Sequence, residues 1–314
     1  MDIDDINIKK FSELSGNDLR DLLNFIHSYY LTYRGGLGIN KNITYGIEIE
    51  FESLKKSIVK KYLEENEIKW KIHADASVKS GGEISSKILH DNVKCWENLK
   101  NICDFLKNNG ATTINGTTGG HIHIGAQIFE TYENYDNFIK CYILYEDILS
   151  RFFCNEYINP RNDVDAYAVL SRKMLLKHNT NYKIFSGRYV ALHDSIISYD
   201  TNFEENTLEF RRPNGTLEEV IWQNNINAVI KMILSIKDIN FDIEYVKYEF
   251  NKYKTLCEID NAFDYQINLK KVLKFVDLFF KETKDKIYFL RQYLKDYELS
   301  CNYDTLIKTK KFWK

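Results

Sequence analysis

The chain has 314 residues, of which 44% are hydrophobic and 28% are charged. This composition is typical of globular proteins and excludes a disordered or fibrous chain. Its 43 basic and 45 acidic residues leave a net charge of −2, so there is no general basic charge to hold a nucleic-acid backbone. We therefore expect no nucleic-acid partner.

The amino-terminal residues and the hydropathy pattern bear on location. Residues 1–16 carry acidic side chains where a secretory leader carries positive charge. No uninterrupted apolar run reaches the roughly 18 residues that a membrane-spanning helix needs. The six cysteines include no CxxC pair, which argues against a zinc ribbon or a disulfide framework. We expect a cytoplasmic protein with no membrane partner.

The first half of the chain mixes helical and strand patterns. Apolar residues recur at helical spacing over 16–31, whereas residues 45–52 (YGIEIEFE) alternate apolar with acidic side chains, as in a strand with one apolar face. The same reasoning predicts, in chain order, a helix over 53–64, a strand near 68–74, a Gly81–Gly82 turn leading into a strand, a helix over 92–108 and a strand over 119–129.

The second half is mainly helical in pattern. Helical spacing covers 130–157 and 164–177, and strands are expected at 187–193 and 206–213. After Thr216, which could cap a helix, almost every segment reads as amphipathic helix. Strands in the first two thirds and helices at the end predict an α+β fold with a largely antiparallel sheet.

Three of the expected strands place ionisable residues at alternate positions. These pairs are Glu48 and Glu50, His121 and His123, and Glu209 and Arg211. Residues two apart on a strand lie on the same face, about 6.5–7 Å apart. If the strands share one sheet, one face carries these groups while the other forms the core. The alternative is that each pair marks only a solvent-exposed strand face.

Two further carboxylates, Asp75 and Glu83, flank the glycine pair at 81–82. Carboxylates crowded into a partly dehydrated site are unfavourable unless cations neutralise them. A ligand set made mostly of oxygen atoms favours Mg²⁺ or Mn²⁺ over zinc. Arg188 and Arg211 support this interpretation, because arginine beside a metal cluster suits phosphate or carboxylate.

Five segments, in this order, resemble the amidoligase family, a branch of the superfamily of glutamine synthetase and γ-glutamylcysteine ligase. They are GIEIEFE, DASVKSGGEISS, TGGHIHIG, RYVALH and LEFRRPNGT, and the resemblance covers about residues 45–225. It implies a glutamine-synthetase-like domain with a curved, mostly antiparallel sheet and helices on its outer face. We expect a helical lead-in over 1–44, this domain over 45–235, and a helical extension over 236–314 packed on the same domain.

The resemblance also implies an activity, the ATP-dependent joining of a carboxylate to an amine through an acyl phosphate, with release of ADP. It implies two Mg²⁺ or Mn²⁺ ions. The ion nearer the substrate carboxylate would be held by Glu50, Asp75 and Glu83. The ion at the ATP phosphates would be held by Glu48, His121 and Glu209.

The remaining motif residues are matched to the nucleotide in the same way. The resemblance implies that Arg211 and Arg188 steady the transferred phosphoryl group and that His123 lies close to the phosphates. The Gly119–Gly120 pair either lets the backbone approach nucleotide phosphate or supplies a turn into the strand.

One position departs from the family pattern: His193 stands where relatives commonly carry Asn.

Two other functions stay open: a metal-dependent hydrolase that uses His121 and His123, and a non-catalytic binding module on the same fold. The expected partners of the ligase are small-molecule or peptide substrates that carry a carboxylate and an amine.

Overall fold

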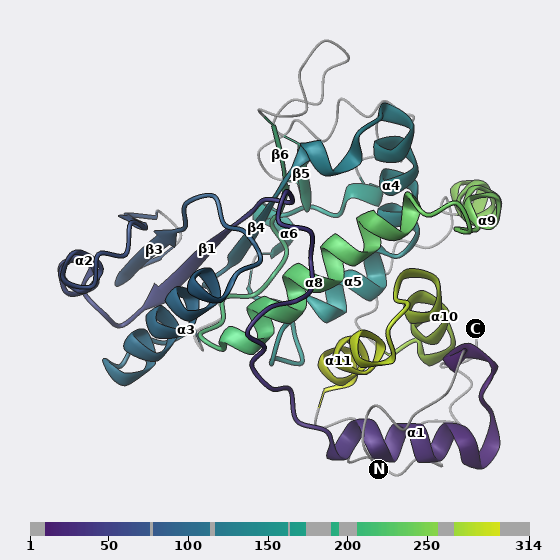
Figure 1. Cartoon of the computed structure of the whole chain (residues 1–314), viewed down its shortest axis with the longest axis horizontal. Coiled ribbons are helices and arrows are strands. Elements are labelled where there is room, and N and C mark those ends of the chain that lie inside the picture. The colour runs from purple at the N-terminus through teal and green to yellow at the C-terminus, as the bar shows by residue number, and fades with distance from the viewer. Residues whose placement is uncertain are drawn as a thin grey trace.

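The structure is a computed structural model of the whole chain (Figure 1). It describes residues 10–75, 78–113, 117–162, 164–173, 190–194, 206–256 and 267–295.

The described strands form one six-stranded sheet in the order β2-β3-β1-β4-β6-β5. Every pairing between these strands is antiparallel. The strands are β1 (Tyr45–Glu52), β2 (Lys71–His73), β3 (Gly81–Ser85), β4 (Gly120–Gly125), β5 (Leu192–Asp194) and β6 (Thr207–Phe210). The protein therefore has an α+β fold with an antiparallel sheet, which confirms the expected fold class.

Helices cover one face of the sheet and continue beyond it, with α3 and α8 running beside the strands (Figure 1). The described α-helices are α1 (Gly16–Ser28), α2 (Lys56–Glu65), α3 (Val93–Asn108), α4 (Tyr132–Leu144), α5 (Glu146–Phe152), α6 (Val164–Tyr167), α8 (Glu219–Ile236), α9 (Ile243–Leu256), α10 (Leu269–Phe279) and α11 (Thr283–Leu294). Short 3-10 helices lie at η2 (Phe11–Glu13) and η3 (Ala126–Phe129). Within the described residues, no helix is long and apolar enough to cross a membrane.

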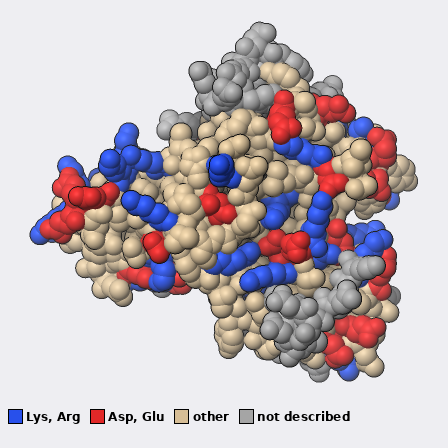
Figure 2. Space-filling model, viewed as in Figure 1, with Lys and Arg blue, Asp and Glu red and all other residues tan. Residues whose placement is uncertain are grey.

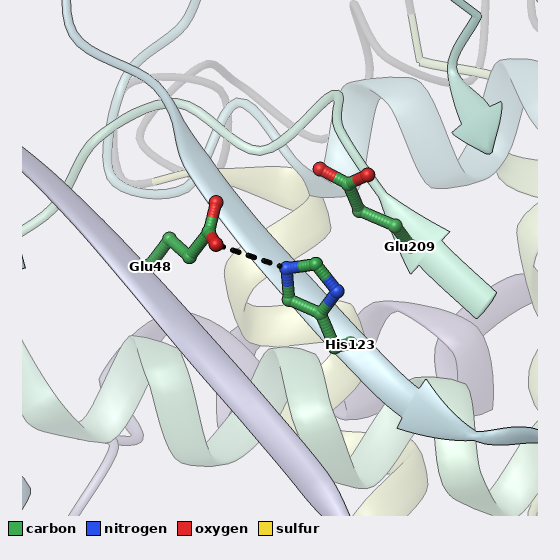
Figure 3. Close-up of side chains that lie close together, drawn as sticks. All are labelled: Glu48, His123 and Glu209. Atoms are coloured by element: carbon green, nitrogen blue, oxygen red, sulfur yellow. Dashed lines mark ion pairs between the residues drawn. The ribbon is translucent and has the colours of Figure 1, made fainter. Parts of the chain in front are cut away.

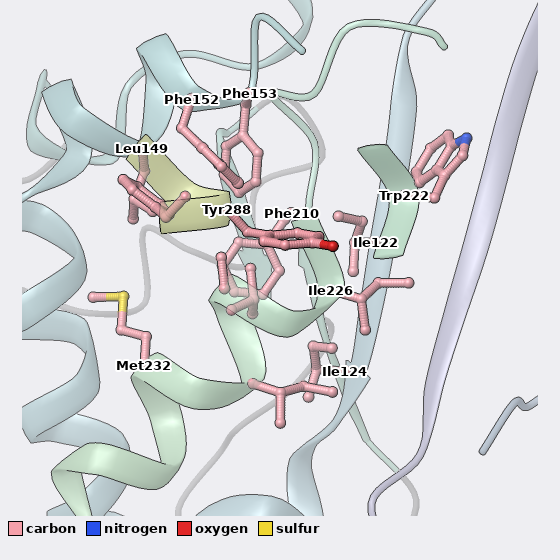
Figure 4. Close-up of a cluster of buried hydrophobic side chains, with 14 of the residues drawn as sticks. Ile122, Ile124, Leu149, Phe152, Phe153, Phe210, Trp222, Ile226, Met232 and Tyr288 are labelled. Carbon is pink, nitrogen blue, oxygen red and sulfur yellow. The ribbon is translucent and has the colours of Figure 1, made fainter. Parts of the chain in front are cut away.

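The apolar positions of the strands form the core against these helices. Ile47, Ile49 and Phe51 of β1 are all buried, as the alternating pattern predicts. Figure 4 shows Ile122 and Ile124 of β4 among side chains of α8, α5 and α11. This packing fixes which face of each strand points inward, so the charged positions must share the opposite face.

The carboxyl-terminal helices pack on the earlier ones. The rings of Phe152 in α5 and Phe289 in α11 stack with their centroids 4.2 Å apart. The Asn224 amide of α8 donates to the carbonyl of Tyr288 in α11 at 2.9 Å. The division at residue 235 stays a prediction, because these contacts describe packing and not independent folding.

Several local expectations differ from the structure. Gly81 and Gly82 are the first residues of β3 and do not form a turn. Glycine is needed at position 81 because a Cβ there would lie 1.8 Å from the carbonyl oxygen of Phe51 on β1. Thr216 is not the cap of α8: the helix begins at Glu219, and the Thr216 hydroxyl accepts from the Glu218 N–H at 3.1 Å. Residues 174–189, which contain part of one expected helix and one expected strand, lie outside the described residues.

Charge is mixed on the visible surface. Figure 2 shows basic and acidic side chains interleaved over this side of the molecule, without one broad area of a single sign. The groups that carry the expected chemistry lie elsewhere, on the open face of the sheet.

Candidate metal and substrate site

The strand register brings the expected ligands together. On the face opposite the core, the directly paired residues are Glu48 with His121, Glu50 with Glu83, and His123 with Glu209. Paired residues of neighbouring strands have Cβ atoms only about 4.5–5.5 Å apart. Four adjacent strands, β3, β1, β4 and β6, therefore build one continuous row of carboxylates and imidazoles.

Imidazole–carboxylate contacts hold the middle of this row. His121 Nδ1 lies 2.7 Å from Glu48 Oε2 and 3.4 Å from Glu209 Oε1. His123 Nε2 lies 3.3 Å from Glu48 Oε1, and Figure 3 shows Glu48, His123 and Glu209 pointing toward one another from β1, β4 and β6. The two histidines thus share the carboxylate of Glu48.

Within the described residues, three overlapping groups have ligand atoms within 4.8 Å of one another. The groups are Glu50–Asp75–Glu83, Glu48–Glu83–His121 and Glu48–His123–Glu209. The first is the set expected nearer the substrate. The set expected at the phosphates is not one of these groups, which join Glu48 and Glu209 with His123 instead, the residue paired with Glu209 in the sheet. His121 nevertheless lies 3.4 Å from Glu209. Five of the six expected metal ligands lie in this row, and the sixth, Asp75, follows β2 and joins the row through the Glu50–Asp75–Glu83 group. Their roles stay predictions.

The crowding of charges shifts the pKa values of the carboxyl groups. Burial, and then the neighbouring charge of Glu48, raise the pKa of Glu83 to about 7. Burial also opposes ionisation of Glu48 and Glu209, but their imidazole partners outweigh it. The pKa of Glu48 is held below its usual range by His121 and His123, and that of Glu209 falls to about 2 beside His193 and His121.

The residues present fit divalent cations. Most of the candidate donors are carboxylate oxygens, the ligands that Mg²⁺ and Mn²⁺ prefer. The Nε2 atom of His121 is buried and has no hydrogen-bond partner among the described residues, whereas buried polar atoms are normally paired. A cation would supply that partner. Its positive charge would also favour the ionised form of Glu83, whose pKa is raised by burial and then by the charge of Glu48.

Two arginines border the row. Arg211, expected from the sequence, donates through Nη1 to Glu209. Arg161, which the sequence analysis did not identify, is buried with Nη1 3.6 Å from Glu50 Oε2. It lies in an irregular segment where no periodic pattern marks a functional side chain, so the sequence carried no signal for it. Arg188 lies outside the described residues.

The glycine pair at the start of β4 is explained by contacts within the protein. A Cβ at Gly119 would meet Arg161 Nη1 at 1.9 Å, and one at Gly120 would meet the Trp222 ring at 2.4 Å. The Gly119 N–H donates to Glu50 Oε2 at 2.5 Å. Both glycines therefore make room for neighbouring side chains, and the expected nucleotide contact there stays a prediction.

His193 joins the site through a carboxylate. It is paired with Glu209 in the sheet, and its Nδ1 lies 2.9 Å from Glu209 Oε2. The histidine at this position thus helps to orient a candidate ligand, as partners of metal ligands commonly do.

One cavity opens onto the row, and a second lies beside the Arg161 loop. One, of about 320 Å³, is lined by Glu48 and His123 together with Gly46, Ser86 and Gln127. The other, of about 420 Å³, lies beside Arg161 and includes Thr118 and Tyr157. The charged row therefore has space for a ligand next to Glu48 and His123.

The protein is thus an α+β protein whose antiparallel sheet carries a candidate cation site rich in carboxylates. Comparison with known families identifies the family to which it belongs. The family described as "Putative amidoligase enzyme" matches residues 55–233, more than half of the chain. The chain belongs to this family, which supports a ligase-type enzymatic role and confirms the resemblance seen in the motifs.

Solved structures add distant likenesses. The chain is 14% identical to a Plasmodium falciparum glutamine synthetase, over 69% of this chain and 54% of that one, with a TM-score of 0.34. A structure described as a novel glutamine synthase homolog is 11% identical over 83% of this chain and 68% of that one, with a TM-score of 0.35. The chain spans about half the length of the first. No curated protein matches it. The fold is defined by the strand order and register of the sheet itself.

Proposed function

We propose that the protein is an ATP-dependent carboxylate–amine ligase that releases ADP and forms an amide bond. The observation that carries this proposal is the convergence of carboxylates and imidazoles from β1, β3, β4 and β6 into adjoining metal-type groups, with arginines beside them. Family membership supports the same class of reaction.

The proposed reaction has two steps. A carboxylate oxygen of the substrate attacks the γ-phosphorus of ATP, the bond to the bridging oxygen breaks, and ADP leaves. The carbonyl carbon, now bearing phosphate as a leaving group, is attacked by an amine, which loses a proton as phosphate departs and the amide forms. Activation is needed because an ionised carboxylate is a poor electrophile, and the first step requires neutralisation of phosphoryl charge.

The residues of the row have corresponding roles in this proposal. Glu50, Asp75 and Glu83 would hold one divalent ion, and Glu48, His121 and Glu209 the other. Such ions neutralise charge on phosphoryl oxygens and orient the reacting groups.

The basic groups bordering the row would act on the phosphates. Arg211, and Arg188 by family resemblance, would steady the transferred phosphoryl group. His123, which lies 3.3 Å from Glu48 and lines the 320 Å³ cavity, would face the phosphates. This cavity supports a nucleotide on the Glu48 side, and the carboxylate substrate would then lie on the Glu50 side.

The test is ADP release from ATP and Mg²⁺ with mixtures of amino acids and peptides. We expect release that depends on both a carboxylate and an amine, and loss of at least about 100-fold in Glu48→Gln and Glu209→Gln, since each removes a ligand charge. Glu64→Gln is the matched control, because the Glu64 side chain is 67% exposed on α2.

Other outcomes would point to the alternative functions. Metal-dependent cleavage of a substrate without nucleotide would indicate a hydrolase using His121 and His123. Metal binding with no turnover under any substrate mixture would indicate a binding module. ADP release by Glu48→Gln at the rate of the unaltered protein would contradict the assigned site.

A further inference from the structure

One buried side chain after β6 fastens the loop that carries Arg161. Asn214 is 5% exposed, and its Oδ1 accepts from the Arg161 N–H at 2.7 Å. Its Nδ2 donates to the carbonyls of Cys154 at 3.2 Å and Asn159 at 3.0 Å. A single amide thus ties both ends of the segment between α5 and α6 together, and it belongs to the LEFRRPNGT motif, whose asparagine had no assigned role.

The segment ends in the guanidinium that meets the candidate metal row. Arg161 lies 3.6 Å from Glu50 and donates through Nη2 to the carbonyl of Arg211 at 3.2 Å. Its Nε has no hydrogen-bond partner among the described residues. With these few contacts of its own, the guanidinium depends on the position of its backbone, which Asn214 holds.

Asn214 is itself anchored to α8 and α11 by a chain of buried amides. Asn155, buried with a φ of 58°, donates to the Asn214 carbonyl at 2.5 Å. Asn225 of α8 donates to Asn155 Oδ1 at 2.9 Å, and Gln292 of α11 donates to Asn225 Oδ1 at 2.7 Å. Because buried amides left unpaired are costly, this chain of bonds resists displacement.

We propose that Asn214 is a positioning residue that sets Arg161 against Glu50 and thereby sets the cation affinity of the Glu50–Asp75–Glu83 group. The inference deepens the proposed function and, for its catalytic consequence, rests on it. A positive charge beside Glu50 competes with a cation for that carboxylate. Holding Arg161 in place therefore keeps the affinity of this group lower than its carboxylates alone would give.

Release of Arg161 should change Mn²⁺ affinity in the opposite direction to a general loosening of the fold. Arg161→Gln should tighten Mn²⁺ binding by about five-fold, an order-of-magnitude expectation for one partly screened charge. Asn214→Ala should tighten it in the same direction, by about two- to five-fold, because Arg161 is released. Disordering of the site would instead weaken Mn²⁺ binding, since the ligands would no longer be held together.

The experiment is titration of the full chain with Mn²⁺ alone, with free Mn²⁺ measured by electron paramagnetic resonance. The double variant Asn214→Ala/Arg161→Gln should bind Mn²⁺ as Arg161→Gln does, because Asn214 acts through Arg161. Asn227→Ala is the matched control: Asn227 is also buried in α8, and it donates to Asp285 Oδ1 at 2.8 Å, outside the chain of amides that anchors the loop. It should lose stability without a change in Mn²⁺ affinity.

Weaker or unchanged Mn²⁺ binding by Asn214→Ala, or an additive effect in the double variant, would overturn the proposal. If Asn214→Ala does not fold, Asn214→Ser provides the same test with a smaller tightening expected. The Mn²⁺ pattern without any ADP release would sustain the positioning role while contradicting the ligase. ADP release without tighter Mn²⁺ binding in the variants would support the ligase while contradicting the positioning role of Asn214.

Discussion

The two faces of the sheet are built from the same strands but follow opposite physical rules. Along β1, Ile47, Ile49 and Phe51 are buried against helices, where apolar contact stabilises the fold. On the other face, Glu48 and Glu50 lie close to further carboxylates, and this crowding of like charges is unfavourable without a counter-charge. The apolar face therefore supplies the stability that allows the charged face to hold its carboxylates close together.

The strongest test of this division is a cavity on the apolar face. Phe210 of β6 is 1% exposed and packs against the rings of Phe138, Tyr142 and Phe153. Phe210→Ala should lower the free energy of unfolding by about 3–5 kcal/mol, through lost burial and the cavity left behind. Urea unfolding measures this, and Mn²⁺ affinity measured where the variant is folded should be unchanged.

A change of Mn²⁺ affinity in folded Phe210→Ala would show that the two faces are not separable. In that case the packing of the core would itself set the geometry of the charged row.

The next test removes a ligand from the charged face. Mn²⁺ at 100 times its Kd should stabilise the unaltered protein by about 2.7 kcal/mol. Glu209→Gln should lose most of this gain, because it removes a carboxylate that adjoins His121 and His123. Thermal unfolding with and without Mn²⁺, reversed by a chelator, measures the difference. Equal stabilisation of both proteins would place the Mn²⁺ elsewhere.

A third test asks whether the charged face costs stability when no metal is bound. Because the pKa of Glu83 is raised from its ordinary 4.5 to about 7, its ionised form destabilises the fold. The cost is absent below pH 4.5, grows between pH 4.5 and 7, and is complete above pH 7. Glu83→Gln should therefore be more stable than the unaltered protein by about 1–2 kcal/mol at pH 8, after allowance for solvent screening.

Near pH 4 the same two proteins should be equally stable, because Glu83 is then neutral. Unfolding curves at both pH values provide the check. A difference that does not change with pH would mean that the gain comes from packing and not from charge.

The smallest effect is expected on a surface that belongs to neither face. Glu64 of α2 lies 3.8 Å from Lys60, and both side chains are 67% exposed. Glu64→Gln should change the free energy of unfolding by less than about 0.5 kcal/mol, because exposed ion pairs contribute little. A larger loss by urea unfolding would show that charge matters beyond the row.

The sequence was sufficient for the faces of the sheet and for most ligand types. Alternation in residues 45–52 follows directly from the geometry of a strand, so the inward and outward sets could be predicted from local pattern alone. Glu50, Asp75 and Glu83 were expected to share an ion, and the structure brings their oxygens together.

What could not be predicted depends on contacts between distant segments. Pairing of His123 with Glu209 is set by the register of β4 and β6, which no local pattern specifies. Arg161 comes from an irregular loop, and its place is fixed by Asn214, 53 residues away. The glycines at 81 and 82 seemed to signal a turn, yet they serve the close approach of neighbouring strands.

The most direct test is a crystal of the full chain soaked with Mn²⁺ and examined by anomalous scattering. The account predicts Mn²⁺ peaks in the row between β3 and β6, coordinated by oxygens of Glu48, Glu50 and Glu83 and by an imidazole of β4. Peaks found only at other surfaces, or none in the row at saturating Mn²⁺, would contradict the claim that this face of the sheet binds divalent cations.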